Sequence, residues 1–294
     1  NEFGEIGLDN LLIESAIENT LLLENGCICC SLRGDLIDTI NDLFAKVRNG
    51  NIPAFSRIVI ETTGLADPSP IVNSLLSETS VTSRCDVKSV ISMVDAIQGV
   101  EQINQYKEAV MQVVQANLGL ISKSDLSTSG KINELVGHLY QINPTLTVKE
   151  IQFGKIDPDT LFSNLRGTIE IPNLSEYENN VEAPLNFTSD QNLGHHGISS
   201  WSFSHEFPID QIKLWEWFSM IYSLRPYQML RTKGIVWVSQ SKSPLLIEAV
   251  GNVVSPPKRL SKWPNNKQLT QLVIIFKGLS REALAASFKR HVIS

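Results

Sequence analysis

Residues 118–125 read Leu-Gly-Leu-Ile-Ser-Lys-Ser-Asp, a short apolar run that leads directly into a polar turn. Such a run is typical of a buried strand, and the turn places charged side chains at its carboxyl end. The same arrangement recurs at residues 87–95, which end in Asp95, and at residues 57–64, which end in Glu-Thr-Thr-Gly. Helical patterns separate these runs. We therefore predict βαβ units and a parallel sheet with helices on both faces.

The pattern changes in the second half of the chain. Residues 169–196 are polar and without periodicity, and they contain the pair His195-His196, which fits either a metal site or a solvated loop. From residue 197 onward, strand, helix, strands and helix follow one another within about 100 residues, as in a small α+β domain. We predict one domain at 1–168, a linker at 169–196 and a second domain at 197–294.

The composition excludes several classes of protein. The chain has 294 residues, 42% of them hydrophobic, and a formal net charge of -6. A net-acidic chain without a long basic run is a poor partner for nucleic acid or an anionic membrane. No apolar run approaches the roughly 18–20 residues of a spanning helix, and no secretory signal is visible. We therefore expect a cytoplasmic protein that binds neither nucleic acid nor membrane.

The turn at 122–125 has the residue types of a guanine-binding loop. In a Lys-x-Asp turn after a strand, the carboxylate of Asp125 can accept hydrogen bonds from two guanine N–H groups, and the stem of Lys123 can pack on the ring. An ordinary surface turn has the same composition. The loop at 61–64 offers a carboxylate, Glu61, that can hold Mg²⁺, and a glycine, Gly64, that lets a backbone N–H approach a γ-phosphate. A plain turn remains the alternative there too.

The cysteines form the sharpest local pattern. Cys27, Cys29 and Cys30 lie within four residues of one another, and thiolates are preferred ligands of Zn²⁺ and Cu(I). The alternatives are reduced buried cysteines and a redox pair. Near the start of the chain, Glu5 lies in an aperiodic segment that fits either a switch loop with an oxygen ligand for the metal or a solvated acidic turn.

Taken together, these motifs resemble the CobW-type family of P-loop GTPases, in particular its YjiA-like branch. The resemblance covers essentially the whole chain, and the Cys-x-Cys-Cys motif is its most specific part. The matching stretches are Asn-Glu-Phe-Gly-Glu at 1–5, Asn-Gly-Cys-Ile-Cys-Cys at 25–30, Glu-Thr-Thr-Gly-Leu-Ala-Asp-Pro at 61–68, Val-Asp-Ala at 94–96 and Ser-Lys-Ser-Asp at 122–125.

The resemblance implies a P-loop GTPase fold followed by a CobW C-terminal-like domain, and a GTP-binding, GTP-hydrolysing metallochaperone. Such a protein delivers a metal, zinc or another transition metal, to a client protein, uses GTP and Mg²⁺, and is compatible with a homodimer. The site residues implied are Glu61 and Gly64 for catalysis, Ser122, Lys123 and Asp125 for the guanine, and Cys27, Cys29, Cys30 and Glu5 for the metal.

Two departures from the family pattern carry expectations. No Gly-x-x-x-x-Gly-Lys phosphate loop occurs in the chain, so we expect the first strand and that loop to precede Asn1, and the chain alone not to be a competent GTPase. Ser122 stands where many members have Asn. Two alternative functions have no GTPase activity: a metal-binding storage or structural protein, and a thiol redox protein. A third alternative is an interaction module that works through the C-terminal domain.

Overall fold

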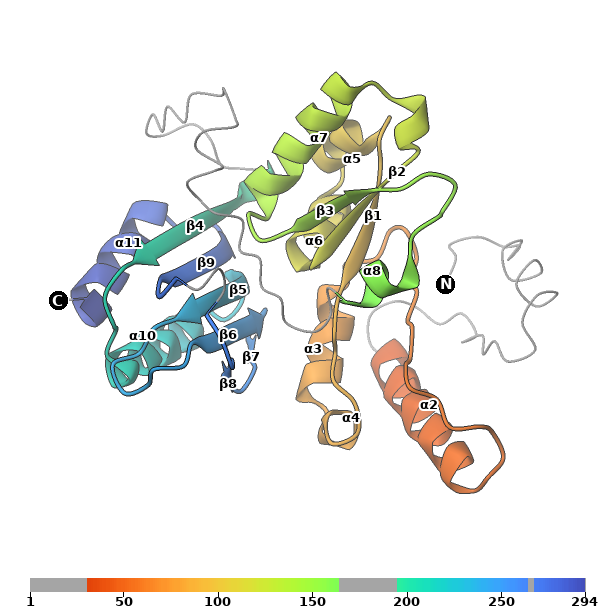
Figure 1. Ribbon diagram of the computed structural model, residues 1–294, viewed down its shortest axis with the longest axis horizontal. Coiled ribbons are helices and arrows are strands. Elements are labelled where there is room, and N and C mark those ends of the chain that lie inside the picture. The colour runs from red at the N-terminus through yellow and green to blue at the C-terminus, as the bar shows by residue number, and fades with distance from the viewer. Residues whose placement is uncertain (1–30, 164–194, 264–266, 294) are drawn as a thin grey trace. The chain divides into compact units, whose positions relative to one another are not determined.

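A computed structural model of the chain describes residues 31–163, 195–263 and 267–293. The chain divides into two compact units, residues 1–87 and residues 88–294, and each is described here by itself. Figure 1 shows the order of the helices and strands along the chain.

The described part of the first unit is helical. It contains α2 (Ser31–Arg48), α3 (Ser69–Ser77) and α4 (Thr79–Thr82). Leu36 and Ile40 of α2 recur at helical spacing and are buried against Leu75 and Val81. Pro70 lies in the first turn of α3, where a missing N–H costs no hydrogen bond. These helices position the loop that precedes α3.

The strand expected at residues 57–61 is not formed. These residues pair with no described strand, and the side chain of Val59 is 78% exposed. The sequence-based prediction of a buried strand was therefore wrong for this segment. An apolar, β-branched run favours extended backbone, but a strand also needs a hydrogen-bonding neighbour, which periodicity cannot reveal.

The second unit begins with the predicted parallel sheet. Its strands are β1 (Ile91–Asp95), β2 (Leu118–Ser122) and β3 (Thr147–Glu150), in the order β1-β2-β3. Both strand pairs are parallel, and Asp95 lies opposite Ser122 in the register. The prediction of parallel βαβ units is confirmed here, and the carboxyl ends of β1 and β2 lie side by side.

Helices cover both faces of this sheet (Figure 1). On one face lie α5 (Gly99–Gln105), α6 (Lys107–Gln115) and α7 (Ser129–Ile142), whose buried side chains pack with Val94 and Ile121. On the other face, Leu161 of α8 (Pro158–Ser163) packs against the cluster that contains Leu118 and Leu120. Side chains that alternate along β2 thus enter opposite cores, as the predicted layered fold requires.

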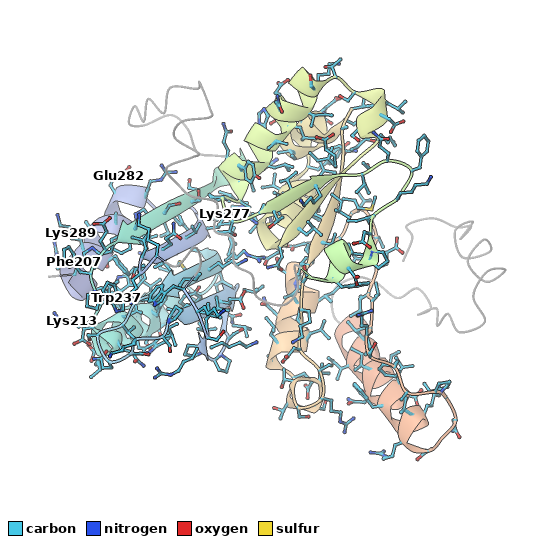
Figure 2. The ribbon with its side chains drawn as sticks, in the orientation of Figure 1. Phe207, Lys213, Trp237, Lys277, Glu282 and Lys289 are labelled. Carbon is cyan, nitrogen blue, oxygen red and sulfur yellow. The ribbon has the colours of Figure 1, made fainter. Side chains whose placement is uncertain are left out.

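An antiparallel sheet with helices forms the rest of this unit. Its strand order is β4-β9-β5-β6-β7, with β8 paired to β6. Trp217 and Phe218 of α10 and Phe288 of α11 are buried against one face of the sheet. Phe207 and Lys213 lie on the surface, just before and within α10 (Figure 2). The elements are β4 (Ile198–His205), α10 (Gln211–Leu224), β5 (Met229–Val236), β6 (Leu245–Val250), β7 (Val253–Val254), β8 (Lys258–Arg259), β9 (Thr270–Lys277) and α11 (Arg281–Phe288).

The two sheets of the second unit share a core at the amino ends of β2 and β3. Ile198, Val273 and Ile275 of the antiparallel sheet pack in the same cluster as α6 and α7. The guanidinium of Arg231, fully buried, donates hydrogen bonds to the carbonyl oxygens of Val114 and Gln115 at the end of α6. A cation there also complements the helix dipole, so Arg231 ties the second sheet to α6.

Asn143 completes this buried polar network. Its amide nitrogen donates to the carbonyl oxygens of Val113, Val114 and Ala116 at 2.9, 3.3 and 3.0 Å. Its amide oxygen accepts from the backbone N–H and the hydroxyl of Thr145 at 3.0 and 2.8 Å. We call Asn143, Thr145, Arg231 and the carbonyls of 113–116 the amino edge of the parallel sheet.

Along the helices that the structure describes, none is both long and apolar enough to cross a membrane. The predicted domain boundaries at 168 and 197 fall at or next to residues outside the described ranges, and they stay predictions.

Candidate functional site

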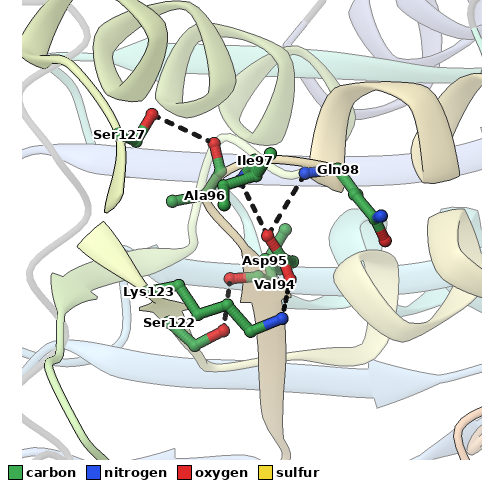
Figure 3. A network of polar contacts seen from close by, with 8 residues as sticks. All are labelled: Val94, Asp95, Ala96, Ile97, Gln98, Ser122, Lys123 and Ser127. Atoms are coloured by element: carbon green, nitrogen blue, oxygen red, sulfur yellow. Dashed lines mark hydrogen bonds and ion pairs between the residues drawn. The ribbon is translucent and has the colours of Figure 1, made fainter. Parts of the chain in front are cut away.

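Polar side chains gather at the carboxyl ends of β1 and β2. Asp95 ends β1, and the loop 122–127 begins at Ser122, the last residue of β2. In open parallel sheets, ligands bind outside the carboxyl ends of the strands. We call Asp95 and the loop 122–127 the carboxyl edge; Figure 3 shows its hydrogen bonds.

The carboxylate of Asp95 makes two kinds of contact. Its Oδ1 accepts from the backbone N–H groups of Ile97 at 2.7 Å and Gln98 at 3.2 Å, in the turn that leads into α5. Its Oδ2 lies 2.6 Å from Nζ of Lys123 (Figure 3). Burial raises the pKa of Asp95, but the hydrogen bonds from Lys123, Ile97 and Gln98 outweigh burial and hold that pKa below its usual value. Asp95 is therefore ionised at neutral pH.

Serine hydroxyls fix the loop 122–127 to its neighbours. Ser122 Oγ donates to the carbonyl oxygen of Val94, and Ser127 Oγ to that of Ala96, each at 3.3 Å. Buried Ser124 donates to the carbonyl oxygen of Ile151, also at 3.3 Å. Lys123 adopts a left-handed backbone conformation with φ 55°, which is uncommon for a residue other than glycine. The loop therefore has a defined shape set by three separate contacts.

The carboxylate of Asp125 lies exposed at the surface of this loop. It lies in the 3₁₀ turn η1 (Ser124–Leu126) and is exposed. Among the residues that the structure describes, its carboxylate has no hydrogen-bond or ion-pair partner. Next to it, Lys123 has a side chain that is 57% exposed. A free carboxylate beside a held lysine can accept two N–H groups of a planar ligand while the lysine stem supports the ring.

The predicted guanine residues Ser122, Lys123 and Asp125 thus lie within four residues of one another in one structured segment. The hydroxyl of Ser122 donates to the carbonyl oxygen of Val94, and the role of Ser122 toward guanine stays a prediction. Sequence reasoning noted the strand-end position of Asp95 but missed its contact with Lys123. The available signal was that the carboxyl ends of neighbouring parallel strands lie side by side.

The predicted catalytic residues lie in the first unit, in the loop that precedes α3. A turn closes through the hydrogen bond from Ala66 N to the carbonyl oxygen of Thr63, at 3.0 Å. The hydroxyl of Thr63 is buried and has no partner within the described residues. Glu61 and Gly64 are exposed, and a methyl group added at Gly64 would meet open space. The carboxylate of Glu61 is an oxygen ligand of the kind that Mg²⁺ prefers.

The predicted metal ligands Cys27, Cys29, Cys30 and Glu5 lie outside the described residues. Within 31–163, 195–263 and 267–293, no group of three His, Cys, Asp or Glu side chains could hold a metal ion. For Cys85, burial raises the pKa of the thiol, with a further contribution from Asp86.

Two family models match the chain. The model described as "CobW/HypB/UreG, nucleotide-binding domain" matches residues 1–150. The model described as "Cobalamin synthesis protein cobW C-terminal domain" matches residues 198–292. The first match contains both predicted nucleotide loops, and the second contains the antiparallel sheet and the helices packed on it.

Curated relatives agree with these matches. The chain is 32% identical to the zinc chaperone YjiA of Escherichia coli over 98% of this chain and 87% of that protein. It is 24% identical to zinc-regulated GTPase metalloprotein activator 1 of Schizosaccharomyces pombe over 66% of this chain and 46% of that protein. It is 33% identical to the zinc chaperone CobW of Pseudomonas aeruginosa over 33% of this chain and 26% of that protein.

A solved structure also matches. The Zn(II)-bound YjiA GTPase of E. coli superimposes with a TM-score of 0.69 and 28% sequence identity. The match covers 87% of this chain and 77% of that one.

Proposed function

The chain belongs to the CobW/HypB/UreG family, and from this premise we propose that the protein binds and hydrolyses GTP and acts as a metallochaperone. Members of the family are GTPases, and the relatives named above are zinc chaperones or zinc-regulated activators of metalloproteins. Zinc is therefore the favoured cargo, and a metal-dependent client protein is the expected partner. We place the protein in the cytoplasm, without nucleic acid or membrane as partner, and a homodimer is compatible with this role.

The observation that carries the proposal is the exposed, unpartnered carboxylate of Asp125 beside Lys123. Guanine presents two adjacent donors, its ring N–H and its exocyclic amino group, and one carboxylate can accept both. Adenine presents an acceptor at the corresponding ring nitrogen, which would meet the negative charge of Asp125. The carboxyl edge is therefore suited to select GTP over ATP.

The phosphates of GTP require a second set of residues. We assign Glu61 and Gly64 to this role: the carboxylate of Glu61 holds Mg²⁺ directly or through water, and the backbone N–H of Gly64 approaches the γ-phosphate. When bound there, Mg²⁺ neutralises charge that develops on the phosphate oxygens. A P-loop would supply the backbone N–H groups that cradle the β-phosphate.

Zinc is cargo in this proposal, held by Cys27, Cys29 and Cys30 with Glu5. Glu5 belongs to the segment that we assign to nucleotide sensing. If bound GTP orders that segment, the geometry of the zinc ligands differs between the GTP and GDP states. Hydrolysis would then release zinc to the client.

The guanine assignment is tested by Asp125→Asn in the full-length protein. Xanthine carries a C2 oxygen where guanine has an amino group, so it needs a donor in place of one of the two acceptors. The amide of Asn supplies that donor. We expect affinity for GDP, measured by calorimetry, to fall at least about 10-fold, and affinity for XDP to rise by a similar factor.

The matched control is Asp159→Asn, which neutralises an exposed aspartate of α8 outside both loops. It should leave both affinities unchanged. If Asp125→Asn and Asp159→Asn gave equal GDP affinities, the guanine assignment would be wrong.

The two alternatives without GTPase activity are tested by metal binding. We expect zinc affinity of the full-length protein to differ between a non-hydrolysable GTP analogue and GDP. A storage or structural metal protein predicts equal zinc affinities and no turnover of GTP. A thiol redox protein predicts a disulfide that depends on Cys29 and Cys30, and no stoichiometric zinc.

A further inference from the structure

The two oxygens of the Asp95 carboxylate have separate partners. Oδ1 accepts the backbone N–H groups of Ile97 and Gln98, while Oδ2 faces the ammonium of Lys123. The first contact stabilises the turn before α5. The second contact joins the end of β1 to the loop after β2, and it acts on a side chain that we assign to the guanine site.

Asp95 is the fixed partner of this pair and Lys123 is the adjustable one. The side chain of Asp95 is 15% exposed and that of Lys123 is 57% exposed. A lysine side chain has many rotamers and loses conformational entropy when it is ordered. An ion pair formed before the ligand arrives removes part of this cost from the binding step.

We propose that Asp95 is a positioning residue for guanine binding, which holds the stem of Lys123 as a platform for the base. The inference rests on the proposed GTP site. The ammonium of Lys123 is held 2.6 Å from Asp95 Oδ2, so its methylene stem spans the distance between the two strand ends (Figure 3). The base packs on that stem while Asp125 accepts its N–H groups.

Asp95→Asn separates the two contacts. The amide oxygen of Asn can still accept from Ile97 and Gln98, and Asn stabilises such turns as well as Asp does. The negative charge opposite Lys123 is lost. We expect the Kd for GDP and the KM for GTP to rise together by about 5- to 10-fold, because the contact acts on ground-state binding. The kcat and the melting temperature should stay nearly unchanged. Glu101→Gln, which neutralises an exposed carboxylate in the first turn of α5, is the matched control and should change neither.

A double-mutant cycle distinguishes positioning from a structural role. Lys123→Met keeps an apolar stem but removes the charge. If Asp95 acts through Lys123, Asp95→Asn should weaken GDP binding less than about 2-fold in the Lys123→Met background. An equal effect of Asp95→Asn in both backgrounds would overturn the inference.

Failure of this inference can be told apart from failure of the proposed function. If Asp125→Asn switches the protein from guanine to xanthine but the cycle shows no coupling, only the role of Asp95 is refuted. If neither Asp125→Asn nor Lys123→Met changes GDP binding, the guanine site itself is refuted, and the role of Asp95 with it.

Discussion

The two edges of the parallel sheet use polar side chains in opposite ways. At the amino edge, Asn143 and Arg231 are buried, and their donors are taken up by carbonyl oxygens at the end of α6. At the carboxyl edge, Asp125 is exposed and has no partner among the described residues, and Lys123 is held by a single ion pair.

This difference shows where stability and ligand binding lie in the fold. Removing a buried amide that donates to three carbonyl groups takes a hydrogen bond from each of them in a site that water does not reach. An exposed carboxylate costs little to keep in water and remains free for a ligand. We therefore expect substitutions at the amino edge to change the free energy of unfolding, and substitutions at the carboxyl edge to change nucleotide binding.

The largest expected effect on stability is that of Asn143→Ala. It removes the donors to Val113, Val114 and Ala116 and the acceptor of Thr145, all in a buried site. We expect a loss of about 3 kcal/mol in the free energy of unfolding, measured by urea denaturation. Gln141→Ala, at an exposed position of α7, is the control. If Asn143→Ala lowered the free energy of unfolding by less than about 0.5 kcal/mol, the two edges would not differ in their contribution to stability.

A smaller effect depends on pH and involves Lys233, two residues beyond Arg231 on β5. Burial, the largest cause, and the nearby charge of Arg231 together lower the pKa of Lys233 to about 8, with Glu248 opposing them. From pH 8 to pH 10 the unfolded chain keeps a proton on this amine that the folded chain has lost. Stability from this group therefore rises with pH in that range. We expect the free energy of unfolding to rise by about 1–2 kcal/mol between pH 8 and pH 10. Solvent screening of this partly exposed side chain keeps the rise small.

The substitution Lys233→Met should remove this rise, while Lys262→Met, at an exposed position, should retain it. Free energies of unfolding at pH 8 and pH 10 measure the difference. An equal rise in the Lys233→Met variant would assign the pH dependence to other groups.

The smallest expected effect on stability is that of Asp125→Ala. The carboxylate is exposed and stabilises no described neighbour, so the free energy of unfolding should change by less than about 0.5 kcal/mol. A loss approaching that of Asn143→Ala would mean that the carboxyl edge also stabilises the fold.

The carboxyl edge could be predicted from sequence because its determinants are local. Each strand-end residue follows a short apolar run that is typical of a buried strand. Neighbouring parallel strands have their carboxyl ends at the same edge of the sheet. The amino edge could not be predicted, because Arg231 and Gln115 are 116 residues apart along the chain. Its signal was a charged residue inside the apolar strand at 229–236, which indicates a buried partner without saying which.

The segment 57–61 illustrates another limit. Its apolar, β-branched residues predicted a buried strand, yet the structure gives it no strand partner among the described residues. β-propensity describes which backbone conformations a residue favours, whereas strand formation also requires a neighbouring strand to pair with. The residues assigned to zinc, by contrast, were predicted from the chemistry of closely spaced thiols and stay predictions.

The most direct test of guanine recognition at the carboxyl edge is a titration with GDP of the ¹⁵N-labelled full-length protein, followed by amide chemical shifts. We expect the amides of 97–98 and 123–127 to shift with GDP and not with ADP, while those of 113–116, Asn143 and Thr145 stay in place. Shifts confined to the amino edge, or equal responses to GDP and ADP at the carboxyl edge, would contradict it.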